Sequence, residues 1–390
     1  MPFFSKKPSK PEKPDYFADM QKKIERLAAA KDSSALIALM SEVQKYRPSE
    51  IADFAVFAQK RNNTVYQAAL ALAELGDPTA VEPVIECVKA VLTSGHGDKG
   101  GWWSPSPQIV ARFGPVAVVP LISRLEKDEL GGTLGDFAAS ALGLIGDQRA
   151  IAPLLKKSQS IGGGGQTYFR PMGIWALGRL GEGREVVDVL VSALFYDQSG
   201  RKSQNEAEAL FALGSGRFGK LAEEVLLPFL NDQKLNFAQR RKVAEVLCAI
   251  GNAEGMEHCL RESSGVALVL LGRFNDERVV QRLVSLLDGP HSDKELGAKW
   301  FFAALGLAEQ GDRRSVRPLV EGLIIPEWGH TFFHPWYHQT MHDLALQALK
   351  KLDKTAVEEL SELSRDADAR IRSQAQALLP VLQVAGSSAN

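Results

Sequence analysis

The 390-residue sequence has few cysteines, almost no net charge and no long hydrophobic run. Its three cysteines, Cys87, Cys248 and Cys259, are widely spaced and form no CxxC pair, which excludes a disulfide framework. They are typical of small buried apolar residues in a reducing compartment, so we expect a cytoplasmic protein. No apolar run approaches the roughly 18 to 20 residues that a membrane span requires.

Charge of one sign is also lacking. The sequence has 46 basic and 47 acidic residues, for a formal net charge of -1, which argues against a whole-surface field for nucleic acid or an anionic membrane. Two basic clusters occur, at 240–242 and around Arg313, Arg314 and Arg317, and we interpret both as solvated helix faces. Nucleic acid is therefore not an expected partner.

The N-terminal stretch has lysines but no apolar segment behind them, so it does not resemble a secretory signal. Its lysine and proline density predicts a disordered arm over residues 1–14, and residues 385–390 are expected to form a disordered tail. Nucleophile motifs are missing too, because the sequence contains no GxSxG and no cysteine in a recognisable nucleophile context.

One short phrase recurs along the chain: a small residue, then Leu, two spacers, an apolar residue and a glycine. Clear copies end at Gly76, Gly146, Gly181 and Gly214, and looser copies end at Gly251 and, with Asp in place of Gly, at Asp353. With Gly114 included, these glycines are 32 to 38 residues apart, which is the length of one helical hairpin. After Ala304-Leu305 the glycine comes late, at Gly311, which we interpret as an insertion.

A second phrase follows several of these glycines. It begins with Gly-Asp and continues to a Pro-Leu or Pro-Val pair, at 76–85, 146–155 and 311–320, with a copy one residue shorter at 114–122. Glycine supplies a left-handed helix end without steric cost, and aspartate can accept from the unpaired amides that begin the second helix. The sequence thus predicts an all-α superhelix of helical hairpins, and no stretch alternates for long enough to predict a sheet.

Together the two phrases resemble the HEAT family, in the short variety called PBS-lyase HEAT-like repeats. The resemblance implies a HEAT/armadillo-type α-α solenoid in which an N-terminal helical cap (15–62) precedes the repeats (63–365) and a C-terminal capping helix (366–384) follows them. The repeat, together with the large aromatic residues in the connections between hairpins, favours a non-catalytic scaffold that binds a protein or peptide partner through its concave face and those connections. Deoxyhypusine hydroxylases are similar in fold but carry repeated His-Glu pairs, and this sequence has no His-Glu dipeptide. A metal-dependent or tetrapyrrole-handling (bilin-lyase-like) enzyme remains the alternative.

The connections between hairpins differ in length and are longest at 93–107, 159–170, 197–204, 288–294 and 325–337. Because each joins a second helix to the next first helix, we expect all of them on one edge of the solenoid. Several contain large aromatic residues, which are favoured anchors at interfaces but are also often folded over helix ends. The candidate partner-binding residues are Trp102, Trp103, Tyr168, Phe169, Trp328, Phe332, Trp336 and Tyr337.

Histidines recur at intervals of four near the last long connection. Pro335 disfavours one continuous helix through His334, whereas His338 and His342 are expected one turn apart at the start of a first helix. That spacing suits two ligands of zinc or another divalent metal, with His334 as a third. In the other interpretation, His338 and His342 extend the packed stripe of the helix that follows. We expect no cofactor, with a divalent metal as the alternative.

Overall fold

The computed structural model describes residues 16–17, 19–46, 54–93, 106–127, 133–161, 167–169, 171–195, 204–261, 264–287, 297–326, 332–333 and 336–387. The chain divides into an N-terminal unit, residues 1–181, and a C-terminal unit, residues 182–390. Both are built almost entirely from helices, as the sequence predicts. Among the described residues, no helix is long and apolar enough to cross a membrane.

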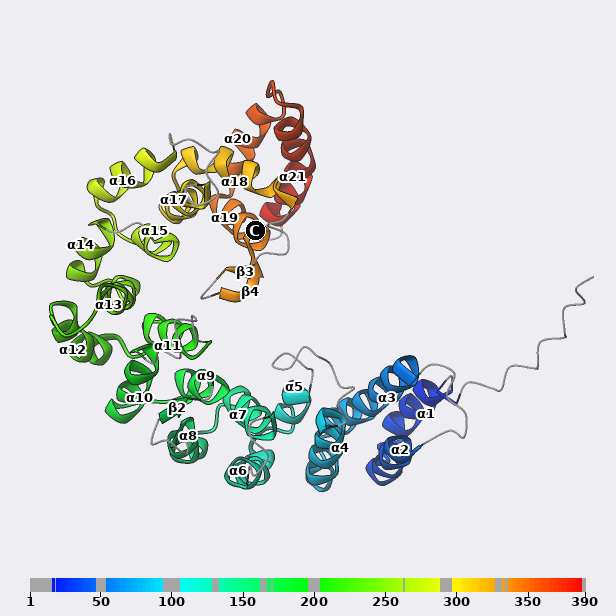
Figure 1. Ribbon diagram of the computed structural model, residues 1–390. Helices are drawn as coiled ribbons and strands as arrows, with labels where there is room; N and C mark the ends of the chain where they lie inside the picture. The colour runs from blue at the N-terminus through cyan, green and yellow to red at the C-terminus, as the bar shows by residue number, and fades with distance from the viewer. Residues whose placement is uncertain are drawn as a thin grey trace, which may run out of the picture. The chain divides into compact units, whose positions relative to one another are not determined.

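The N-terminal unit consists of helical pairs joined by short turns. Its elements are α1 (Met20–Ala29), α2 (Ser33–Lys45), α3 (Phe54–Leu75), η1 (Pro78–Ala80), α4 (Val81–Thr93), α5 (Ser106–Ala111), η3 (Gly114–Ala117), α6 (Val118–Glu126), α7 (Thr133–Ile145), η4 (Gln148–Ala150), α8 (Ile151–Ser158), β1 (Gln159–Ile161), β2 (Thr167–Phe169) and α9 (Pro171–Leu180). Helices α3, α5, α7 and α9 form one row, and α2, α4, α6 and α8 form the other (Figure 1).

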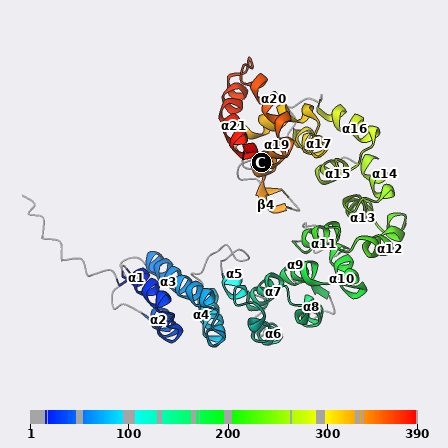
Figure 2. The same cartoon turned by 180° about the vertical axis from the view of Figure 1, so that it is seen from behind.

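The C-terminal unit repeats this two-row plan. Its elements are α10 (Arg184–Phe195), α11 (Gln204–Gly214), α12 (Gly219–Leu230), α13 (Phe237–Ala249), α14 (Ala253–Arg261), α15 (Gly265–Leu271), α16 (Glu277–Leu287), α17 (Gly297–Glu309), η5 (Arg313–Ser315), α18 (Val316–Leu323), β3 (Phe332–Phe333), β4 (Trp336–Thr340), α19 (Met341–Leu352), α20 (Lys354–Leu363) and α21 (Ala369–Ser387). Helices α11, α13, α15, α17 and α19 lie on the inner side of this unit's curve, as both faces show (Figures 1 and 2). We call them the inner row.

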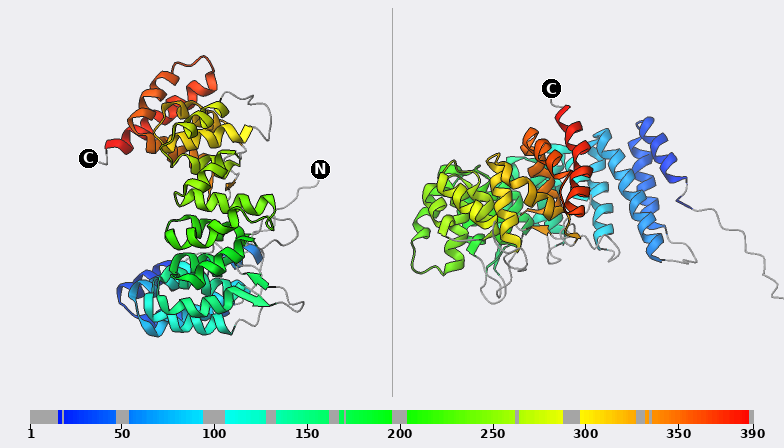
Figure 3. Two further views of the ribbon diagram at one scale, coloured as in Figure 1. Left: turned by 90° about the vertical axis from the view of Figure 1, so that its left-hand side faces the viewer. Right: turned by 90° about the horizontal axis from the view of Figure 1, so that it is seen from above.

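Helices within each unit run side by side, so that successive pairs stack (Figure 3). The core lies between the two rows and is filled by leucine, valine, isoleucine and alanine side chains. The recurring Ala-Leu pair is buried in most copies, for example at Ala141-Leu142 and Ala176-Leu177. The small residue of the phrase therefore does what its size suggests, because it lets neighbouring first helices approach.

The turn inside each hairpin follows the predicted chemistry at most positions. Gly76, Gly114, Gly146, Gly251 and Gly311 all have a positive φ, between 65° and 88°. The prediction is wrong at two places, because the left-handed residue is Gly183 rather than Gly181, and Gly216 rather than Gly214. Neither of these turns carries the Gly-Asp pair, and a second glycine two residues later takes the left-handed conformation instead.

The aspartate of the second phrase caps the next helical turn, as predicted. A side-chain oxygen of Asp77 accepts from the backbone N–H of Thr79, Asp147 from that of Arg149, and Asp312 from that of Arg314, each at 2.9 Å. Where the residue two positions on is arginine, its guanidinium also binds the same carboxylate, so backbone and side chain form one clip. The same clip occurs at Asp276-Arg278 and Asp368-Arg370.

One copy of the first phrase was missed in the sequence, and another was read in the wrong register. Ala267-Leu268 with Gly272 is a full copy that ends α15. In α17 the small residue is Gly306 rather than Ala304, which places Gly311 at the normal spacing without an insertion. The backbones of α15 and α17 meet here, because a Cβ added to Gly272 would lie 2.1 Å from the carbonyl oxygen of Gly306.

Two short antiparallel hairpins were not predicted. β1 pairs with β2 and places Ser160 opposite Tyr168, and β3 pairs with β4 and places Phe333 opposite Trp336. Both lie in long connections between helical pairs. Strands of two to five residues are too short for an alternating pattern to stand out.

The terminal helices lie close to the predicted positions. Helices α1 and α2 fall within the predicted N-terminal cap, and α3 continues through residue 62, where we placed the boundary with the repeats. The final helix α21 buries Ile371, Ala375, Leu378 and Leu382 on one face. The predicted arm at 1–14 lies outside the described residues. The predicted disordered tail at 385–390 is wrong for residues 385–387, which continue α21, and residues 388–390 lie outside the described part.

Candidate functional site

The structure describes some of the aromatic candidates from the long connections and not others. Trp102, Trp103 and Trp328 lie outside the described residues. Tyr168 and Phe169 belong to β2 of the N-terminal unit, whereas Phe332, Trp336 and Tyr337 belong to the β3–β4 hairpin of the C-terminal unit. Only the backbone of these five residues is described, so their role as partner anchors stays a prediction.

The predicted helical pair of histidines is wrong. His338 belongs to β4, and α19 begins only at Met341, because Thr340 and Asp343 form a reciprocal capping box at its N-terminus. His342 is in the first turn of α19, and its Nε2 lies 2.9 Å from the carbonyl oxygen of Ile325. A carbonyl oxygen accepts a hydrogen bond only from a nitrogen that carries a proton, so Nε2 has no free lone pair with which to bind a metal.

His334 lies outside the described residues. Within the described part of the chain, no group of three or more His, Cys, Asp or Glu side chains is placed to hold a metal ion. The proposal of a divalent metal held by His334, His338 and His342 therefore rests on sequence spacing alone, without the helical geometry that motivated it.

The basic cluster at 240–242 is not a solvated face, which corrects the sequence interpretation. Lys242 is largely buried, and its Nζ lies 2.8 Å from Glu206 Oε2 and 3.4 Å from the carbonyl oxygen of Leu194. Arg240 donates to the carbonyl oxygens of Asp232 and Leu235 at the start of α13. These cations hold α13 to the residues before it and to helices α10 and α11, and are engaged within the fold.

By contrast, the arginines near 313 are exposed, as expected. Each is nevertheless paired with a carboxylate: Arg313 with Glu359, Arg314 with Asp312, and Arg317 with Asp366 and Glu321. The hydrogen bond from Arg314 holds the pKa of Asp312 below the ordinary value. The pKa of Asp366 is lowered by the backbone N–H of Asp368 and, after it, by Arg317, because both stabilise the ionised carboxylate.

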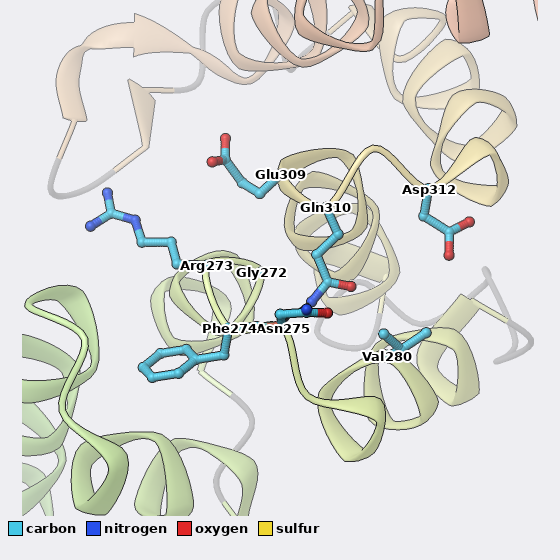
Figure 4. Close-up of a pocket in the computed structure, with 8 residues that line it drawn as sticks. All are labelled: Gly272, Arg273, Phe274, Asn275, Val280, Glu309, Gln310 and Asp312. Atoms are coloured by element: carbon cyan, nitrogen blue, oxygen red, sulfur yellow. Dashed lines mark hydrogen bonds between the residues drawn. The ribbon is translucent and has the colours of Figure 1, made fainter.

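An open cavity of about 450 Å³ lies in the C-terminal unit between two neighbouring hairpin turns. Its walls are Gly272, Arg273, Phe274, Asn275, Val280, Glu309, Gln310 and Asp312. Figure 4 shows Arg273 and Glu309 on one side and Asp312 on the other, with Gln310 and Asn275 between them.

Most polar groups of this cavity already have partners. Gln310 donates to the carbonyl oxygen of Phe274 at 2.8 Å, and Arg273 donates to that of Ala249 at 2.8 Å. Glu309 binds Lys351 at 2.5 Å, and Asp312 is held in its clip with Arg314. The cavity is therefore a polar recess whose side chains tie neighbouring repeats together.

The inner row of the C-terminal unit combines exposed rings with buried carboxylates. Phe211 on α11 and Phe237 at the start of α13 are 48% and 60% exposed, which is unusual for phenylalanine. Glu208 on α11 and Glu245 on α13 are each only 5% exposed. Burial raises the pKa of Glu208 to about 7, because the charged form loses hydration.

Sequence reasoning missed these inner-row residues, although a signal was present. Glu208 and Glu245 both stand directly before the small-Leu pair of the first phrase, at Ala209-Leu210 and Val246-Leu247. In these two copies the position is buried, so a charged residue there is unusual, whereas in other copies it is half-buried, as at Trp175, or exposed, as at Gln347. Phe211 and Phe237 gave no comparable signal, because a phenylalanine in a helix is ordinarily buried.

These features define an all-α helical repeat array in which the hairpins share one recurring phrase. Residues 65–90 and 136–160 match the family model of the PBS lyase HEAT-like repeat, which confirms the resemblance inferred from the sequence. The first match covers the end of α3 and most of α4, and the second covers most of α7, all of α8 and the start of β1. The comparison with curated proteins finds no match.

Proposed function

We propose that the chain is a non-catalytic HEAT-like scaffold that binds a protein or peptide partner along its inner row and through its aromatic connections. The observation that carries the proposal is the exposure of Phe211 and Phe237 on two neighbouring inner-row helices. Exposed aromatic rings on a repeat surface are typical anchors for a partner, because their burial on binding removes a large apolar area from water.

Two further observations support this proposal. The three cysteines are buried and free, as expected for a protein of the reducing cytoplasm, where we place it. Arrays of stacked hairpins present long surfaces that suit extended segments of a partner. The aromatic residues of the connections, with Trp102 of the N-terminal unit and Trp336 of the C-terminal unit as representatives, would supply further contacts to a partner.

A quantitative affinity enrichment from source cells tests the proposal with three variants. Phe211→Ala combined with Phe237→Ala should lower the retention of a specific partner by at least about tenfold, as the loss of two interface anchors predicts. Trp102→Ala combined with Trp336→Ala tests the connections in the same way. Val381→Ala is the matched control, because Val381 is 51% exposed on α21 of the same unit.

Circular dichroism should show unchanged folding of all three variants, since the described target side chains are at the surface. A partner that wild type and Val381→Ala retain equally, and that the Phe211/Phe237 variant loses, supports the scaffold. Retention of every partner by both aromatic double variants would contradict it.

A further inference from the structure

Glu208 and Glu245 occupy the same position in neighbouring repeats but have different surroundings. Glu245 Oε1 accepts a hydrogen bond of 2.6 Å from the hydroxyl of Ser264, which is the N-cap of the next inner-row helix. Arg241, one turn before Glu245 on α13, places its Nε 3.7 Å from the same oxygen. The buried carboxylate of Glu245 thus has both a hydroxyl donor and a cation.

Glu208 has neither of these partners. The residue of α13 that corresponds to Ser264 is Val243, which is fully buried and has no polar group. The residue that corresponds to Arg241 is Gln204, which is uncharged and whose side chain lies outside the described part. No hydrogen bond or ion pair joins Glu208 to any described residue, so the fold leaves this carboxyl without the two groups that its counterpart has.

The charged groups of the helices that pack against α11 are engaged elsewhere, except Glu185, which is exposed. They are Arg184, Glu185 and Asp188 of α10, Arg240, Arg241, Lys242 and Glu245 of α13, and Glu206 of α11 itself. Arg184 pairs with Asp188 at 2.9 Å, and Lys242 pairs with Glu206. Burial alone accounts for the raised pKa of Glu208.

Phe211 follows Glu208 by three residues, so the two lie on the same side of α11. Its half-exposed ring offers an apolar surface and an aromatic face next to the carboxyl. The long stems of arginine and lysine cover apolar surface well, and their cations are attracted to aromatic faces.

We propose that Glu208 and the ring of Phe211 form a recognition position for an arginine or lysine side chain of the bound protein or peptide. The inference rests on the scaffold function proposed above and adds the chemistry of one contact. The partner's cation pairs with the carboxylate of Glu208, as Arg241 does with that of Glu245, and its stem packs on Phe211.

Calorimetric binding of a capped Leu-Arg-Leu tripeptide to the full-length protein tests this position, with the uncharged Leu-citrulline-Leu peptide as the matched probe. The arginine peptide should bind more tightly, and its affinity should fall by about tenfold from about pH 8 to about pH 6, because only the ionised carboxylate attracts the cation. Glu208→Gln should remove both the preference for arginine and this pH dependence.

Glu185→Gln is the matched control, because it removes an exposed carboxylate from the neighbouring helix α10. It should leave the binding of the arginine peptide unchanged. Equal binding of the two peptides, no binding of either, or unchanged binding by Glu208→Gln would overturn the recognition position. A cellular partner that is lost with the Phe211/Phe237 variant but kept by Glu208→Gln would leave the scaffold function standing and remove only this contact.

Discussion

At the scale of single residues, Glu208 is a carboxyl group that burial makes harder to ionise than usual. Its folded-state pKa is about 7, against an ordinary value of 4.5, so the folded protein holds this proton more tightly than the unfolded chain. The free energy of unfolding therefore falls as pH rises from about 4.5 to about 7, and the loss persists at higher pH.

Glu208→Gln should remove this loss, because glutamine does not ionise. The variant is expected to be more stable than wild type at about pH 8, by up to about 3 kcal/mol, with a much smaller difference at about pH 5. Thermal unfolding at both pH values measures the effect, with Glu185→Gln as the control for an exposed carboxylate. A stability difference that does not change with pH would show that Glu208 is ionised at little cost in the folded protein.

Gly272 and Gly306 also matter at this scale, because the backbones of α15 and α17 meet at these two residues. A Cβ added to Gly306 would lie 2.4 Å from the carbonyl oxygen of Leu268, which is closer than real contacts allow. Gly306→Ala should therefore lower the free energy of unfolding by about 1 to 3 kcal/mol, despite alanine's better helix propensity.

Chemical denaturation measures this loss, and Gly214→Ala is the comparison. A Cβ at Gly214 meets only the methyl group of Ala249, at 3.0 Å, so its effect should be smaller. Equal stability of Gly306→Ala and wild type would mean that α15 and α17 can separate without cost.

At the scale of single elements, the aspartate clips decide where second helices begin. Asp312 caps the turn at η5 through the backbone N–H of Arg314 and also binds that arginine's guanidinium. Asp312→Ala should cost about 1 kcal/mol of stability, as loss of an N-cap typically does. Arg314→Ala should cost less, because it removes only a half-exposed ion pair. Urea titrations of both variants check the order, and a larger loss for Arg314→Ala would show that the ion pair dominates.

The sequence predicted these elements well where one residue type has one physical role. Glycine with a positive φ and aspartate at the following N-cap both act within a few residues, so Gly76-Asp77 and Gly146-Asp147 could be recognised without a structure. The start of α19 was misplaced because a spacing of four between histidines also fits a helix that begins before His338. The capping box of Thr340 and Asp343 instead sets the start at Met341.

The candidate site could be predicted much less well, because it depends on neighbouring repeats. That Glu208 lacks partners follows from Val243 on α13, more than 30 residues away in the sequence. The engaged state of Lys242 follows in the same way from Glu206 and Leu194 on other helices. Such pairs emerge only when the register between stacked hairpins is known.

At the scale of the whole molecule, charge balance leads to a prediction about partners. With a net charge of -1 and its described arginines largely paired, the protein should not bind nucleic acid through a general field. Fluorescence anisotropy with a labelled random-sequence duplex at low salt should show no appreciable binding. Tight binding that weakens steeply as salt rises would contradict this expectation and indicate a basic surface in the residues outside the described part.

The matched positions of Glu208 and Glu245 have a consequence for how such an array can change. Each hairpin contacts only its neighbours, so one substitution at this position alters the contact site of a single repeat and leaves the other repeats unchanged. The preference of the array for a partner's side chains could then be changed one repeat at a time, in evolution or by protein engineering. Replacing Gln204 with arginine and Val243 with serine would give Glu208 partners within the fold and remove its recognition position. Replacing Arg241 and Ser264 with uncharged and apolar residues would leave Glu245 without its partners and create a second such position.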